Sequence, residues 1–162
     1  MINTDNITQI LLESLAAGFI APAFAMLFAV PKQYLIFIAS GGMLTRFIRS
    51  FLLYSLNVEI VIATFAACAV ISLIFIYVGP KLGVPRPVFT VASVIALIPG
   101  MDAYNALLSL ISLVEITDIA LFDTYVFTLM HSGVRCVAIL LAIALGIAIP
   151  PLFFYNYRNR LR

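Results

Sequence analysis

Apolar residues run along this chain in five long stretches, separated by short segments that are polar or rich in proline and glycine. A helix that crosses a bilayer needs about 20 consecutive apolar residues, and each stretch is that long. The pattern therefore predicts an all-α membrane protein, a bundle of five transmembrane helices forming a single integral membrane domain over residues 1–162. The predicted spans cover about residues 7–30, 34–56, 58–78, 87–113 and 124–149, and Pro150-Pro151 is expected to close the last one.

The fourth stretch is interrupted near its middle. Pro99 has no amide hydrogen and its ring clashes with the carbonyl group four residues earlier, while Gly100 accepts almost any backbone angle. We therefore expect a fourth helix that is kinked or broken at Pro99-Gly100, followed directly by Asp102, Tyr104 and Asn105. Inside a bilayer, an interrupted backbone beside polar side chains is tolerated only where protein or water covers it, so the break is predicted to line a site.

Composition supports the membrane assignment and narrows the function. The chain is 64% hydrophobic and 10% charged, whereas soluble domains carry roughly 25% charged residues. Its net charge of +2 gives no reason to expect nucleic-acid binding. Cys68 and Cys136 lie in apolar runs without metal or redox spacing and are interpreted as small buried hydrophobic residues. The sequence has no Gly-x-Ser-x-Gly, no His-Glu-x-x-His and no phosphate-binding glycine loop, so we expect neither an enzyme nor a cofactor or metal site.

The basic residues outside the spans predict how the chain is oriented. With five spans, one side of the membrane receives Lys32, Lys81, Arg86, Arg158, Arg160 and Arg162. The other side receives the acidic residues Asp5, Glu59, Glu115, Asp118 and Asp123. Because cytoplasmic loops carry the excess of lysine and arginine, the N-terminus is predicted outside and the C-terminus in the cytoplasm.

Several ionisable residues lie within the spans, where each costs about 3 kcal/mol at the membrane centre. They must therefore face one another or water, and two explanations stay open. Glu13 and Asp102 could pair with two of three arginines and hold the helices together. Alternatively, three arginines against two carboxylates could form an anion site, because arginine binds carboxylates in a bidentate manner. The candidate substrate-binding residues are Arg49, Arg135, Pro99, Gly100, Asp102, Tyr104, Asn105, Arg46 and His131.

Four segments carry a resemblance to a known family. They are residues 21–28 before Val30-Pro31, residues 56–59 before Thr64-Phe65, residues 88–92 followed by Ile98-Pro99-Gly100-Met101-Asp102-Ala103-Tyr104, and residues 146–150. With these the chain resembles the threonine/serine exporter family, specifically the small subunit of its split, two-gene form, the YjjB-like proteins. Of the candidate site residues, only Pro99, Gly100 and Tyr104 match the family pattern.

The resemblance implies a ten-span exporter of the bacterial inner membrane. In the split form a larger YjjP-like subunit supplies five spans and a cytoplasmic N-terminal region, and family substrates include threonine, serine and dicarboxylates such as succinate. We therefore expect a subunit of a secondary exporter of small carboxylate metabolites, working in the lipid bilayer by alternating access around the broken fourth helix. Formation of a homo-oligomer stays open. The alternatives are a non-transporting assembly or stabilising subunit, whose buried charges are structural, and a channel.

Overall fold

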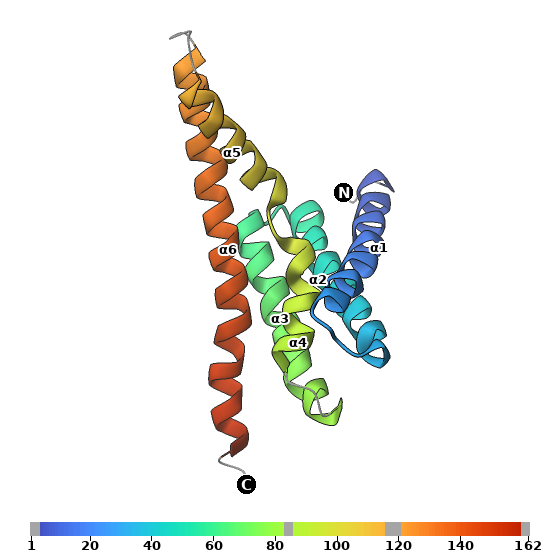
Figure 1. Ribbon diagram of the computed structural model, residues 1–162. Helices are drawn as coiled ribbons and strands as arrows, with labels where there is room; N and C mark the ends of the chain where they lie inside the picture. Colours follow the sequence, from blue (N-terminus) through green and yellow to red (C-terminus); the bar gives the residue numbers. More distant parts are fainter. Residues whose placement is uncertain (1–3, 83–85, 116–120, 160–162) are drawn as a thin grey trace. The chain divides into compact units, whose positions relative to one another are not determined.

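All regular elements are helical in the computed structural model, which describes residues 4–82, 86–115 and 121–159 (Figure 1). Asp118, Arg160 and Arg162, which contribute to the predicted orientation, lie outside these residues. The order is α1 (Thr4–Leu27), η1 (Lys32–Tyr34), α2 (Leu35–Leu56), α3 (Ile60–Leu82), α4 (Arg86–Val94), η2 (Ile95–Leu97), α5 (Gly100–Val114) and α6 (Phe122–Asn159). The all-α prediction is confirmed.

Four of the described helices are long and apolar enough to cross a membrane. They contain Asn6–Leu27, Lys32–Leu56, Ile60–Gly79 and Phe122–Phe154. A fifth span results if the segments Pro87–Leu97 and Gly100–Val114, on either side of the break, are counted as one. The five-span count and the kinked fourth helix therefore stay predictions, while the multi-span character is clear.

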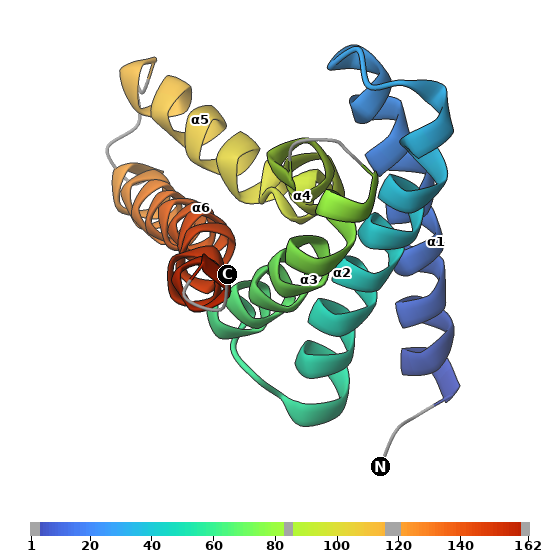
Figure 2. The same cartoon turned by 90° about the horizontal axis from the view of Figure 1, so that it is seen from below.

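The chain divides into two compact units. The first comprises Met1–Leu97 together with Ala142–Arg162, and the second is Ile98–Leu141. In the first unit α2 packs against α1, α3 and α4 (Figure 2). The second unit contains α5 and the part of α6 that precedes Ala142. The single domain expected over the whole chain stays a prediction.

Two adjacent glycines allow α2 to approach its neighbours closely. A Cβ atom at Gly42 would lie 2.6 Å from Ala21 Cβ and 2.9 Å from the carbonyl oxygen of Ala17 on α1. A Cβ atom at Gly41 would lie 2.8 Å from the ring of Phe75 on α3. Small residues at such positions let helix backbones pack at short range, which favours helix association in a bilayer.

The last helix does not end at Pro150-Pro151, since α6 continues to Asn159, and the end of the last span stays a prediction. A proline keeps a φ angle that suits a helix, but it has no N–H to donate to the carbonyl four residues earlier. For Pro151 that carbonyl belongs to Ile147, and the Ser72 hydroxyl of α3 donates a 3.1 Å hydrogen bond to it. A side chain of α3 thus supplies the donor that the proline lacks, and the helix continues.

Both cysteines are free thiols in apolar surroundings. Cys68 on α3 is fully buried and Cys136 on α6 is half-buried. A Cβ atom at Gly146 would lie 2.6 Å from Cys68 Cβ, so the last part of α6 packs tightly on α3 within the first unit.

Candidate functional site

The backbone leaves the helical conformation at Ile98 and Pro99. A residue before proline is disfavoured in the α region, which explains why the preceding helical segment stops at Leu97. Pro99 has φ −79° and ψ 66°, and the Gly100 N–H donates a 2.9 Å hydrogen bond to the Ile98 carbonyl. These are the features of an inverse γ-turn. The helix α5 then begins, with the Ala103 N–H bonded to the Pro99 carbonyl at 3.0 Å.

Two arginines of α2 bind the carbonyl groups at the end of η2. Arg49 Nη1 donates to the Leu97 carbonyl at 2.8 Å, and Arg46 Nη1 donates to the Ala96 carbonyl at 3.3 Å. The last carbonyls of a helix have no partner within the helix and form the negative end of its dipole. Two positive guanidinium groups therefore satisfy them. Arg49 is only 8% exposed, so its charge lies within the first unit and not at the surface.

A second group of polar side chains surrounds the carboxylate of Glu13 on α1. Arg46 Nε lies 3.3 Å from Glu13 Oε2, and the Ser50 hydroxyl donates to the same oxygen at 2.5 Å. The Tyr54 hydroxyl donates to Glu13 Oε1 at 3.2 Å, and Gln9 Nε2 donates to Oε1 at 3.4 Å and to the Tyr54 oxygen at 2.9 Å. We call these five residues the Glu13 cluster. Through Arg46, the cluster connects directly to the carbonyl end of η2.

In the second unit the carboxylate of Asp102 also has an arginine partner. Arg135 Nε lies 3.6 Å from Asp102 Oδ2. Asp102 is in the first turn of α5, where a negative charge stabilises the helix dipole. The ring of His131 stacks on Phe127 with centroids 5.8 Å apart. Tyr104 is 58% exposed and Asn105 is half-buried.

Each of the two carboxylates thus has an arginine partner, as the first of the two explanations expected: Glu13 pairs with Arg46 and Asp102 with Arg135. The third arginine, Arg49, binds the main-chain carbonyl of Leu97. The structure brings Arg46 and Arg49 together in the first unit, and Asp102 and Arg135 together in the second. His131 and Tyr104 are exposed and do not join either group.

Glu13 was expected only as a counterion for an arginine, and its hydroxyl donors were not predicted. A signal was available, because Arg46, Ser50 and Tyr54 follow one another at intervals of four residues within an apolar stretch. Gln9 and Glu13 have the same spacing on the preceding span. Residues four apart lie on one helix face, so each set forms a polar stripe.

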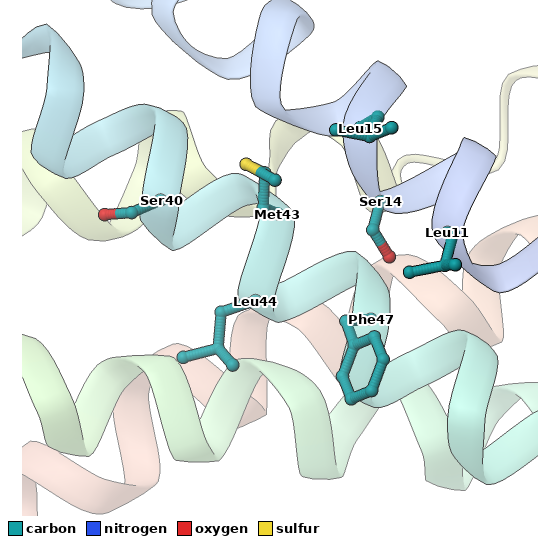
Figure 3. A pocket seen from close by; sticks show the side chains of 7 residues that line it. All are labelled: Leu11, Ser14, Leu15, Ser40, Met43, Leu44 and Phe47. Carbon is teal, nitrogen blue, oxygen red and sulfur yellow. The ribbon is translucent and has the colours of Figure 1, made fainter.

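A groove of about 480 Å³ between α1 and α2 has a different chemistry (Figure 3). Its polar atoms are the hydroxyls of Ser14 and Ser40, and the remaining lining residues are Leu11, Leu15, Met43, Leu44 and Phe47. Both hydroxyls donate to carbonyls of their own helix, at 2.6 Å to Ile10 and 2.9 Å to Phe37. The groove therefore suits apolar groups and offers nothing to an anion. Within the described ranges no three histidine, cysteine or acidic side chains come together as metal ligands.

The family model described as Threonine/Serine exporter, ThrE, matches residues 13–153 of the chain. The chain belongs to the threonine/serine exporter family. The match covers both acid–base pairs and the break, and the resemblance seen in the sequence is confirmed at the level of the family. Together with the long apolar helices, it identifies this exporter-family chain as a multi-pass membrane protein.

An uncharacterized protein of Haemophilus influenzae is 34% identical to this exporter-family chain over 150 residues, which are 93% of the chain and 49% of that protein. The chain therefore spans about half the length of this curated relative. No solved structure matches the chain.

Proposed function

We propose that the chain is one subunit of a secondary exporter in the bacterial inner membrane, which moves small carboxylate metabolites. The substrates are dicarboxylates of the succinate type, or threonine and serine. Transport proceeds by alternating access around the break at Ile98 and Pro99. The observation that carries this proposal is the end of η2, where Arg46 and Arg49 bind main-chain carbonyls at an interrupted helix. Many secondary transporters build substrate sites from the exposed backbone groups of discontinuous helices.

Each candidate residue has a role in this proposal. Arg49 and Arg135 are proposed to contact substrate carboxylates, and Arg46 lies one turn from Arg49 on α2. Pro99 and Gly100 create the break. Asp102 would compete with the substrate anion for the start of α5, and the remaining polar side chains, Tyr104, Asn105 and His131, offer hydrogen bonds to the substrate.

The rest of the transporter comes from another chain in this proposal. Because the chain spans about half of its relative, a larger YjjP-like subunit with five spans and a cytoplasmic N-terminal region would complete the exporter. The chain then corresponds to the small subunit of the split form. Its N-terminus faces outward and its C-terminus lies in the cytoplasm, as the positive-inside rule requires.

A second candidate function is a non-transporting assembly subunit. The pairing of Glu13 with Arg46 and of Asp102 with Arg135 favours it, because paired charges can hold helices together without binding a ligand. A channel is a further alternative.

Efflux measurements separate the exporter from the assembly subunit. The chain is expressed with and without a larger five-span partner, and efflux of labelled succinate, threonine and serine is measured in cells. An exporter requires efflux with the partner present and a large loss in Arg49→Ala and Arg135→Ala at normal protein levels. Lys32→Ala is the matched control, because Lys32 is an exposed basic residue outside the proposed site. Full efflux in both arginine variants would contradict the anion site. Absence of efflux from the wild-type chain with its larger partner would contradict the exporter and favour the assembly subunit.

A further inference from the structure

The Glu13 carboxylate is held by donors on both of its oxygens. Oε2 receives the Ser50 hydroxyl at 2.5 Å and lies 3.3 Å from Arg46 Nε. Oε1 receives Tyr54 at 3.2 Å and Gln9 at 3.4 Å. A carboxylate has two oxygens with about four lone-pair sites, so these donors complete its hydrogen bonding. The other four residues of the Glu13 cluster therefore form a carboxylate-binding site, which the side chain of Glu13 occupies.

The position of this site connects it to transport. Glu13 lies about two and a half turns from the start of α1 and inside Asn6–Leu27, a segment long and apolar enough to cross a membrane, so we expect the cluster to lie within the bilayer. Ionisable residues at such depth are costly and mark substrate or proton pathways. The side chains of Arg46 and Glu13 keep exposed fractions of 24% and 22%, so neither is fully enclosed by the surrounding helices. Arg46 also holds the Ala96 carbonyl at the end of η2.

We infer that the Glu13 cluster is a binding site for the carboxylate of the substrate, which Glu13 vacates when it takes up a proton. This rests on the proposed exporter function and names the site and its coupling. The proton converts the Glu13 carboxylate to a neutral carboxyl group, Arg46 keeps its positive charge, and the substrate carboxylate replaces Glu13 as its counterion. One proton enters for each carboxylate bound, so the net charge of the cluster does not change.

The other charged groups nearby are consistent with this exchange. Among the described side chains of α1, α2, α4 and η2, those that face the Glu13 carboxylate are Arg46 and Tyr54, with Arg49 one turn away on α2. The segment η2 contributes main-chain carbonyls and no ionisable side chain. A substrate anion entering beside an ionised Glu13 would bring a second negative charge next to the Glu13–Arg46 pair, and uptake of a proton by Glu13 removes that repulsion.

The test measures succinate binding and proton uptake in membrane vesicles that contain the chain with its larger partner. Wild-type affinity for succinate should fall by up to about tenfold per pH unit as pH rises, the slope for one linked proton, and succinate should cause proton uptake from a weak buffer. Glu13→Gln should bind succinate with no pH dependence and no proton uptake. Glu13→Asp should keep the pH dependence. Glu59→Gln, which removes an exposed carboxylate at the start of α3, should behave as wild type.

The outcomes are distinguishable. A Glu13→Gln protein that keeps the wild-type pH dependence, or that is present at normal levels and binds no succinate, overturns the inference and leaves the exporter function intact. Absence of binding by the wild type for succinate, threonine and serine at every pH overturns both. If the Glu13→Gln protein does not accumulate, succinate binding by the Tyr54→Phe protein tests the inference instead. Loss of one donor should weaken succinate binding about two- to tenfold at low pH, and unchanged binding contradicts the site.

Discussion

Arg49 on α2 donates a 2.8 Å hydrogen bond from Nη1 to the carbonyl oxygen of Leu97, the last residue of η2. The two residues are far apart in sequence, and the arginine is almost completely buried. In a bilayer no water is available for a carbonyl that a helix break leaves without a donor. A charged side chain from a neighbouring helix therefore stabilises the end of η2, and the break depends on α2 as well as on Pro99.

Replacing Arg49 by methionine should lower stability, because the buried Leu97 carbonyl loses its donor. The expected loss is about 1–3 kcal/mol in the free energy of unfolding. Arg49→Lys keeps a positive donor and should lose less. Thermal unfolding in detergent, followed by circular dichroism, measures both variants. Equal stability of the wild-type and methionine proteins would show that the bond does not stabilise the fold.

Ser72 and Pro151 should be energetically coupled, although no bond joins them. Ser72→Ala removes the donor to the Ile147 carbonyl and should cost about 0.5–1.5 kcal/mol. In a Pro151→Ala background the restored backbone N–H can donate to the same carbonyl, and the cost of Ser72→Ala should fall toward zero. A double-mutant cycle of unfolding free energies measures the difference. The same cost in both backgrounds would contradict this explanation of how α6 passes its prolines.

Gly42 and Gly100 should respond in opposite ways to alanine. A Cβ atom at Gly42 meets Ala21 Cβ at 2.6 Å, so Gly42→Ala must separate α1 from α2 and should cost about 1–3 kcal/mol. A Cβ atom at Gly100 meets nothing within 4 Å, so Gly100→Ala should not lower stability. Thermal unfolding of the two variants side by side provides the comparison. A stable Gly42→Ala protein would mean that α1 and α2 are less closely packed than these distances indicate.

The predicted orientation can be tested by cysteine labelling. In a background with Cys68→Ala and Cys136→Ala, a membrane-impermeant thiol reagent should label Asp118→Cys from the periplasm. Arg160→Cys should be labelled only from the cytoplasm, after the membrane is opened. The expectation follows from the distribution of lysine and arginine between the two sides. The reverse labelling pattern would contradict the topology.

Much of the architecture could be predicted because the bilayer imposes simple requirements on local sequence. The apolar stretches have the length of a membrane span, and four helices of that kind are present. Pro99 ends a helical segment by sterics that involve only its neighbours, so the interruption was also predictable. Arg46 and Arg49 share a helix face for the same local reason.

The partners of these side chains depend on which helices lie side by side, and a single sequence does not contain that information. Helical spacing could suggest the polar stripe on α2, but not that it faces Glu13 and the end of η2. Pro150-Pro151 looked like a helix end because local rules could not anticipate the Ser72 hydroxyl on α3. The sequence by itself determined which stretches form long apolar helices and where the helical backbone is interrupted before Gly100, since hydrophobicity and proline sterics act over a few residues. Only the tertiary structure decided how the buried charges and unpaired carbonyls are satisfied, because their donors come from other helices.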